Sequence, residues 1–308
     1  MMINDAHCHF FSTPLLAALA RQRGRTPAET PADLFRTLGW DDPGSADELS
    51  DRWVQELDAA SVSRAALIAS IPGDEASVAA AVARHPSRFV GFFMVDAAAA
   101  DAVERTQRAV TELGLRGVCL FPAMHHVPLG DPRTMRVVEA AAATPGTVVF
   151  VHCGVLSVGV RRKLGLPSRF DLSLGDPLGV SRLALAFPDT PFIIPHFGAG
   201  LFREALMAAD TCPNLYLDTS SSNSWTRYIP GLTLDAAFAA ALKVVGPSRL
   251  LFGSDSSFFP RGWQRGVFQQ QNQIVEQLDL ATSDQQLIFG GNFDRLFPDH
   301  RGAETQRR

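Results

Sequence analysis

Two histidines spaced two residues apart, His7 and His9, are the residues of this sequence best suited to grip a metal ion. They end a predicted strand over residues 2–9, and side chains alternate between the two faces of a strand. Both imidazoles should therefore point the same way. The pair alone is a weak signal, because most His-x-His pairs are ordinary core or surface histidines.

Three further residues of metal-binding type, His152, His196 and Asp255, each end a short apolar run. In a barrel of parallel strands the carboxyl ends converge on a single mouth, so residues far apart in sequence meet there. Imidazole and carboxylate ligands suit one divalent transition metal ion, zinc first, with manganese, iron and cobalt as alternatives. Such a ligand set leaves room for a water molecule.

The elements that must position these residues alternate regularly. Eight apolar runs predict strands, at residues 2–9, 64–70, 89–96, 115–121, 147–153, 192–197, 215–220 and 250–255. Helical patterns occupy residues 45–60, 76–84, 97–113, 133–143, 181–187, 201–209, 234–245 and 267–278. This alternation implies an α/β fold with a parallel sheet, and eight repeats allow a (β/α)₈ TIM barrel. The alternative, an open doubly wound sheet, favours a glycine-rich turn after the first strand, and residues 10–14 do not supply one.

We expect a single domain over residues 1–308, with long mouth loops at residues 10–44 and 154–179. Both segments follow predicted strands and contain several prolines and glycines. Loops at this end of a barrel form the walls or lids of active sites.

The composition, with 46% hydrophobic and 19% charged residues and a net charge of -4, is typical of a compact soluble protein. It predicts no nucleic-acid or membrane partner, and a cytoplasmic location follows by default because no apolar run reaches membrane-spanning length. The four cysteines lack a Cys-x-x-Cys spacing, which favours reduced, buried thiols. Whether the chain forms a homo-oligomer stays open.

Together these residues resemble the amidohydrolase superfamily. The sequences LFGSD at 251–255 and GNFDRLF at 291–297 are similar to its amidohydrolase-related branch, which includes aminocarboxymuconate-semialdehyde decarboxylase-like enzymes. The resemblance implies metal ligation by His7, His9, His152 and Asp255, with His196 beside the metal or, in binuclear members, on it.

The predicted fourth strand argues for a single ion. Binuclear relatives often carry a lysine or an acidic residue there, whereas residues 115–121 read LRGVCLF. We interpret Cys119 as a packing thiol. Cys8 and Cys153 alternate to the face opposite the neighbouring ligands and should point toward the helices.

The predicted activity is hydrolysis of a small carboxylate-bearing ester, lactone or amide by metal-activated water. Asp255 would take the proton from the water, and His196 would help to polarise the carbonyl. The same ligands also serve the alternative, a nonoxidative decarboxylase of an aromatic or unsaturated carboxylic acid. A further alternative is an inactive barrel that only binds metal or ligand.

Positive charge in the predicted mouth loops favours an anionic small-molecule substrate. Arg227, Arg261 and Trp263 are the candidate substrate-binding residues, because an arginine can clamp a carboxylate and an indole can stack on a planar substrate. Solvated or packing side chains remain an equal alternative for each of them.

Overall fold

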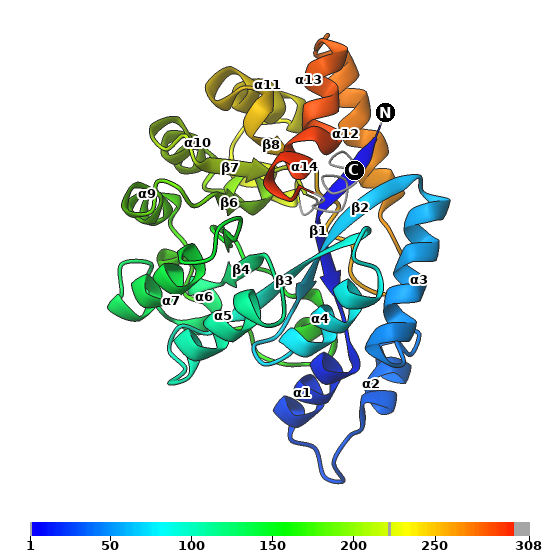
Figure 1. The fold of residues 1–308 in the computed structure, drawn as a ribbon. Helices are drawn as coiled ribbons and strands as arrows, with labels where there is room; N and C mark the ends of the chain where they lie inside the picture. Colours follow the sequence, from blue (N-terminus) through cyan, green and yellow to red (C-terminus); the bar gives the residue numbers. More distant parts are fainter. Residues whose placement is uncertain (1, 221–222, 299–308) are drawn as a thin grey trace, which may run out of the picture.

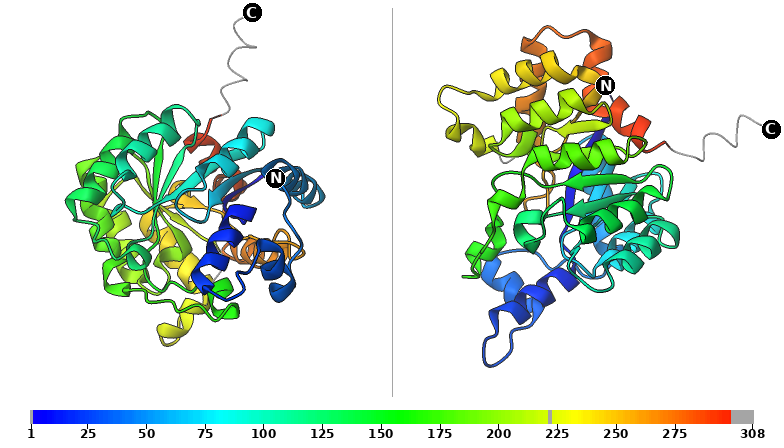
Figure 2. Two further views of the ribbon diagram at one scale, coloured as in Figure 1. Left: turned by 90° about the horizontal axis from the view of Figure 1, so that it is seen from below. Right: turned by 90° about the vertical axis from the view of Figure 1, so that its left-hand side faces the viewer.

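The computed structural model describes residues 2–220 and 223–298, so the expected domain range also includes Met1 and residues 221–222 and 299–308, which lie outside the described part. Eight parallel strands pair in sequence order around a barrel, and helices form the outer ring (Figures 1 and 2). The predicted TIM barrel is therefore confirmed. The strands are β1 (Ile3–Phe10), β2 (Val62–Ala69), β3 (Phe89–Val95), β4 (Gly117–Leu120), β5 (Val148–Val151), β6 (Phe192–Ile194), β7 (Leu215–Asp218) and β8 (Leu250–Leu251).

All eight predicted helices are present, although some begin or end elsewhere than expected. The α-helices are α1 (Thr13–Arg23), α2 (Pro31–Leu38), α3 (Ala46–Ala59), α4 (Glu75–Arg84), α5 (Ala102–Thr111), α6 (Pro122–His125), α7 (Pro132–Ala142), α8 (Gly159–Lys163), α9 (Pro177–Ala186), α10 (Phe202–Thr211), α11 (Leu234–Val245), α12 (Arg265–Gln277), α13 (Thr282–Gln286) and α14 (Asn292–Leu296). The largest shift is in α5, which begins at Ala102 because Asp96 accepts hydrogen bonds from Ala98 and Ala99 and holds a turn before the helix.

The strands are apolar on both faces because each face is covered. Ile68, Phe92 and Phe150 fill the barrel interior, whereas Leu67 and Phe93 pack between the sheet and the helices. Residues adjacent in sequence thus serve opposite layers, which explains the continuous apolar runs.

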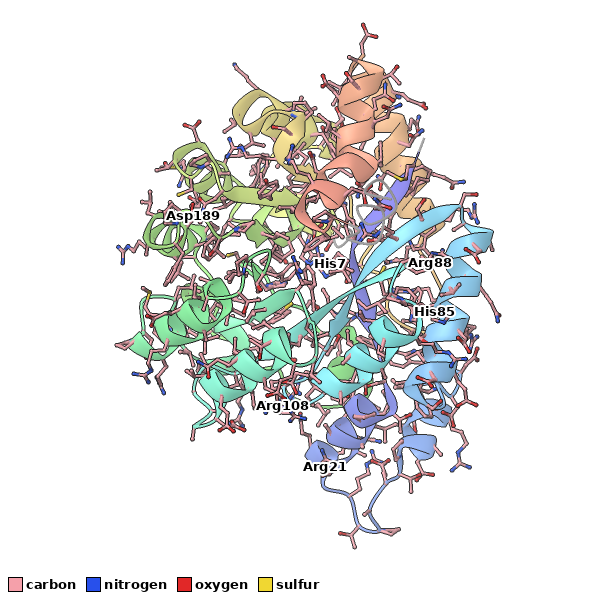
Figure 3. All side chains as sticks on the ribbon, in the orientation of Figure 1. His7, Arg21, His85, Arg88, Arg108 and Asp189 are labelled. Atoms are coloured by element: carbon pink, nitrogen blue, oxygen red, sulfur yellow. The ribbon has the colours of Figure 1, made fainter. Side chains whose placement is uncertain are left out.

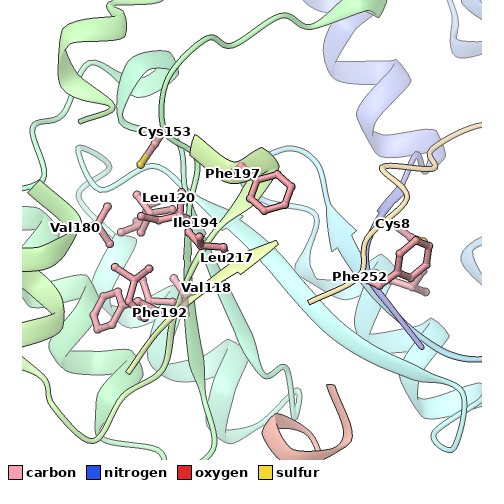
Figure 4. Packing of buried hydrophobic residues seen from close by; sticks show 14 of the residues in the cluster. Cys8, Val118, Leu120, Cys153, Val180, Phe192, Ile194, Phe197, Leu217 and Phe252 are labelled. Atoms are coloured by element: carbon pink, nitrogen blue, oxygen red, sulfur yellow. The ribbon is translucent and has the colours of Figure 1, made fainter. Parts of the chain in front are cut away.

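The cysteines follow the same two layers, and all four are free and buried. Cys8 and Cys153 lie in the outer layer (Figure 4), as predicted. Cys119 packs inside the barrel among apolar side chains, so its interpretation as a packing thiol is confirmed.

The two predicted mouth loops contain helices, which corrects their assignment as plain loops. Residues 10–44 hold α1 and α2, and residues 154–179 hold α8. Their apolar side chains form a separate small core that includes Leu16, Leu34 and Leu164. The sequence carries local signals for the first two of these helices. Ser12 caps α1, and Thr30 with Asp33 forms a capping box before α2.

The C-terminal helix α14 closes the end of the barrel where the strands begin. Phe293, Leu296 and Phe297 pack into the barrel interior, and Arg64 near the start of β2 donates a 2.7 Å hydrogen bond to Asp294. The α14 helix thus covers one end of the barrel, and the predicted site residues lie at the opposite end. No helix in the described part of the chain is long and apolar enough to cross a membrane.

Candidate metal centre

The ends of β1 and β8 bring three of the predicted ligands together. Nε2 of His7 and Nε2 of His9 are 3.4 Å apart, and Asp255 Oδ1 lies 3.2 Å from the latter and 3.8 Å from the former. All three ligand atoms are within 4.8 Å of one another. Figure 3 shows His7 near the centre of the barrel.

A β-bulge in β1 turns His7 inward. Between Asp5 and Cys8, β1 carries one residue more than the facing stretch of β2. Ala6 already packs inside the barrel, and strict alternation would then point His7 outward. The extra residue allows both to face the interior, which is a common use of bulges beside functional sites.

Hydrogen bonds fix which ring nitrogen of each histidine on β1 carries the proton. Nδ1 of His7 donates to Asp218 Oδ2 at 2.6 Å. The hydroxyl of Ser70 donates to the Ile68 carbonyl at 3.0 Å, so it accepts from Nδ1 of His9 at 2.7 Å. A neutral ring with its proton on Nδ1 presents a bare Nε2.

The pKa shifts define the charges in this cluster. Burial lowers the pKa of His9, which favours its neutral form. Burial alone would raise the pKa of Asp255, but the hydrogen bond with His9 and the charge of His7 hold it well below its usual range. Nε2 of His9 therefore lies 3.2 Å from an ionised oxygen of Asp255. At this distance a cation lies between the two atoms, either the proton of a hydrogen bond or, where Nε2 is bare, a metal ion.

His7 differs from the other histidines of the site. Burial alone would lower its pKa, but the charge and hydrogen bond of Asp218 outweigh burial and raise the pKa above its ordinary value. The arrangement of a ligand histidine with a carboxylate on its far nitrogen is the usual way in which proteins orient metal-binding imidazoles.

His152 stands beside this group but outside the three-residue cluster. Its ring stacks on Phe121 with centroids 5.3 Å apart, and it lies 5.4 Å from the ring of His196. Burial lowers the pKa of His152 well below its ordinary value. Its Nδ1 has no hydrogen-bond partner within residues 2–220 and 223–298, which leaves the ring held by packing alone.

His196 is tied to the centre through Ser220. The Oγ of Ser220 lies 2.8 Å from Nδ1 of His196 and 3.0 Å from Nδ1 of His7. The rings of the two histidines are 5.0 Å apart between centroids. Burial, followed by the charge of His7, lowers the pKa of His196.

Two residues of the centre have backbone conformations that L-amino acids rarely adopt. His196 has φ 54° and Asp255 has φ 58°. Non-glycine residues in this region cost about 1 kcal/mol or more, and such strain is concentrated at functional sites. The surrounding bonds hold Asp255 in place: its backbone N–H donates to the His7 carbonyl at 2.9 Å, and Gln264 Nε2 donates to the Asp255 carbonyl at 3.0 Å.

The three candidate substrate-binding residues have different environments. Arg261 is exposed and donates to Ser257 Oγ at 2.6 Å and to the Asp255 carbonyl at 3.2 Å. Arg227 is also exposed and donates to the hydroxyl of Tyr228 at 2.8 Å.

Trp263 lies in the core, which corrects its prediction as a substrate-binding residue. Only 4% of its surface is exposed, and its indole packs against Phe252 and Phe268 in the layer outside the barrel. Its Nε1 donates to the buried Asp5 at 2.7 Å. The apolar body of the indole and its single donor are both satisfied there.

A chain of aromatic rings leads away from the centre. The ring of Phe11 lies 5.6 Å from that of His9 and 5.6 Å from that of Trp40, which stacks on Phe258 at 4.2 Å. The guanidinium of Arg261 covers the ring of Phe258 at 4.6 Å. These three rings, of Phe11, Trp40 and Phe258, form an aromatic wall that connects a candidate ligand with an exposed cation.

The sequence reasoning missed Ser70, Asp218 and Ser220. Each follows or ends a strand at the same end of the barrel as the predicted ligands, and each contacts a ring nitrogen of a site histidine. The available signal was their position at or just after the ends of strands. Residues there can reach the second nitrogen of a histidine ligand, which needs a hydrogen-bond partner.

The donor set fits a divalent transition metal ion. At zinc–ligand distances of about 2.0–2.1 Å, tetrahedral ligand atoms lie roughly 3.3 Å apart, and the separations among His7, His9 and Asp255 are close to this value. Two oriented imidazoles and an ionised carboxylate are ligands for such an ion.

Solved structures of similar fold cover nearly the whole chain. A manganese-bound variant of 5-carboxyvanillate decarboxylase from Novosphingobium aromaticivorans has a TM-score of 0.66 at 13% identity, covering 96% of this chain and 97% of its own. A zinc-bound amidohydrolase from Burkholderia multivorans gives 0.61 at 17%, covering 96% and 99%. A probable 2-pyrone-4,6-dicarboxylic acid hydrolase from Acinetobacter baumannii, with citric acid bound, gives 0.59 at 15%, covering 97% and 100%. No curated protein sequence matches this chain significantly.

The sequence itself matches a family model across residues 4–298, which is nearly its full length, and the family is described as amidohydrolase. The resemblance inferred from the metal-type residues is confirmed by this match, and the barrel agrees with it. The chain belongs to the amidohydrolase family.

Proposed function

We propose that this enzyme is a metal-dependent hydrolase that acts on a small carboxylate-bearing ester, lactone or amide. The observation that carries the proposal is the convergence of three ligand atoms, Nε2 of His9 at 3.2 Å from the ionised Asp255 and at 3.4 Å from Nε2 of His7. We assign His7, His9, His152 and Asp255 as ligands of one divalent ion, zinc first. When bound, the ion would supply Lewis acidity and lower the pKa of a water molecule to about 7.

The chain supplies the remaining groups for hydrolysis. Asp255, ionised at neutral pH, accepts the proton of the attacking water. His196, anchored at Nδ1 by Ser220, lies beside His7 and His152 and stabilises the developing negative charge on the substrate oxygen.

Arg261 is the better candidate for binding the substrate carboxylate. It contacts the backbone of Asp255 and lies over Phe258, at the outer end of the aromatic wall that begins at His9. Arg227 engages Tyr228 and has no such link to the centre among the contacts of the described residues.

A nonoxidative decarboxylase is the second candidate, and the aromatic wall favours it. An aromatic acid beside His9 would contact the partly exposed ring of Phe11, which stacks on the buried ring of Trp40. One of the similar structures is a decarboxylase solved with 3-methoxy-4-hydroxy-5-nitrobenzoic acid.

Metal content tests the ligand assignment. Elemental analysis should find about one ion per chain in the wild type and loss of that ion in both His152→Ala and Asp255→Asn. His85→Ala is the control, because His85 pairs with Asp51 away from the centre and its removal should leave the ion in place. Full metal retention in both ligand variants would refute the assignment.

Product analysis separates the two reactions. The metal-loaded enzyme is incubated in ¹⁸O-labelled water with two panels, one of lactones and esters that carry a carboxylate and one of hydroxybenzoates. Label in a new carboxyl group supports hydrolysis. Release of carbon dioxide without label in the product would refute hydrolysis and establish the second candidate, whereas metal-loaded protein inert to both panels would favour a binding barrel.

A further inference from the structure

Asp5 is a fully buried carboxylate at the seam between β1 and the segment that follows β8. Its Oδ1 accepts hydrogen bonds from the backbone N–H groups of His7, at 2.9 Å, and Ser254, at 3.0 Å. Its Oδ2 accepts from Nε1 of Trp263 at 2.7 Å. One carboxylate thus joins three segments of the chain.

Three hydrogen bonds between backbone groups also cross this seam. The pairs are Ala6 N–H to Phe252 O at 2.8 Å, Asp255 N–H to His7 O at 2.9 Å, and His9 N–H to Ser256 O at 2.7 Å. At the β-bulge this pattern is interrupted, and Asp5 Oδ1 serves as the acceptor for β1 and for the segment after β8. The two backbone N–H groups that donate to Oδ1 belong to His7 and Ser254, and Ser254 is the immediate neighbour of Asp255.

Trp263 provides a rigid partner for Asp5. Its backbone N–H donates to Glu56 Oε1 at 3.0 Å, and its ring packs against Phe252 and Phe268. The indole is therefore held independently of Asp5, and its Nε1 determines where the carboxylate lies.

We propose that Asp5, held by Trp263, is a positioning residue that sets His7 opposite Asp255 across the barrel seam. The inference rests on the proposed metal-dependent function. The physical reason is that metal affinity depends on donor positions to within about 0.5 Å, and the bulge at His7 leaves this part of β1 without a regular strand ladder to hold it. Trp263 thus acts on the centre from the outer layer and not as a substrate contact.

The test compares two indole-to-phenyl substitutions, Trp263→Phe and the control Trp53→Phe. Both indoles are buried, but Nε1 of Trp53 has no hydrogen-bond partner in the described part of the chain, so the control removes similar volume without breaking a bond. Trp263→Phe should bind Zn²⁺ about 10- to 100-fold more weakly than the wild type. It should also alter the visible absorption spectrum of the Co²⁺-loaded protein, whereas Trp53→Phe should retain both properties.

A second variant covers the case in which Trp263→Phe does not fold. Asp5→Asn keeps an oxygen for the backbone donors but offers an NH₂ group to Nε1 of Trp263, and we expect the same weakening. If the wild type binds Zn²⁺ and the variants match it in affinity and Co²⁺ spectrum, only the positioning inference is overturned. If the wild type itself binds no metal, the proposed function fails together with it.

Discussion

At the scale of single residues, the centre is determined by what each imidazole contacts on its second nitrogen. Asp218 and Ser70 accept hydrogen bonds from Nδ1 of His7 and of His9, so both Nε2 atoms face the same point. His152 lacks such a partner among the described residues and is held by stacking on a phenylalanine ring. Hydrogen-bonded partners therefore orient two candidate ligands, and packing orients a third.

Asp218→Asn tests the importance of this orientation. The amide cannot carry the negative charge that stabilises the Nδ1 proton of His7, so we expect Zn²⁺ affinity to fall about 10- to 100-fold. Competition titration with a chromogenic chelator measures the change. Asp210→Asn on the exposed face of α10 is the control, and equal affinities of the two variants would contradict the prediction.

At the scale of elements, the connections after the strands are as important as the strands. From His196 to Gly200, five consecutive residues have positive φ, which forms a left-handed turn directly after β6. The turn is supported by the connection after β5, where Val155 N–H donates to the Ala199 carbonyl at 2.8 Å. Two neighbouring connections thus brace one another and place His196.

Gly154→Ala tests this bracing. A Cβ at Gly154 would lie 2.2 Å from the Gly198 carbonyl oxygen and 2.4 Å from that of Ala199, which are backbone atoms that cannot move aside easily. We expect a loss of about 3 kcal/mol in the free energy of unfolding, measured by urea denaturation.

The matched control for this substitution is Gly24→Ala. Gly24 has φ 58° compared with 66° at Gly154, and a Cβ there meets no atom within 4 Å. Only the backbone penalty of about 1 kcal/mol then applies. Similar losses in the two variants would show that the close approach of the two connections contributes nothing.

At the scale of the whole molecule, the barrel is closed at one end and carries the candidate metal centre at the other. The α14 helix fills the end where strands begin, and the rings of the aromatic wall at the mouth pack in the small core of α1, α2 and α8. Outside the candidate centre, several partly exposed carboxylates accept hydrogen bonds from neighbouring donors.

The response to acid follows from these carboxylates. Hydrogen bonds from Thr30 hold the pKa of Asp33 at about 2, those from Arg84 do so for Asp51, and those from Arg133 do so for Asp131. The folded-state pKa values lie below the ordinary 3.8, so the ionised groups stabilise the fold above this pH. This contribution is lost as pH falls from 3.8 to about 2.

A triple variant with asparagine at positions 33, 51 and 131 measures this contribution. Its free energy of unfolding should be lower than that of the wild type at pH 7, and the difference should shrink between pH 4 and pH 2. Urea denaturation at each pH gives both curves. Curves that stay parallel over this range would contradict the prediction.

Much of the fold could be predicted from the sequence, because local patterns report local structure. The apolar runs at residues 147–153 and 192–197 predicted strands, and the helical pattern at 45–60 predicted α3. His7, His9 and Asp255 follow from the same logic, since residues at the carboxyl ends of barrel strands meet. The helices in the mouth segments were missed although Ser12 and Thr30 carried capping signals.

The tertiary structure decided what depends on contacts between distant segments. Asp218 is 211 positions from His7, and Asp5 is 258 positions from Trp263, so no periodic pattern could connect them. A bulge is a mismatch between two strands and exists only once they pair. The sequence by itself therefore determined the barrel and the residue types at its mouth, whereas tertiary packing decided how His7 points and that Trp263 is a core residue.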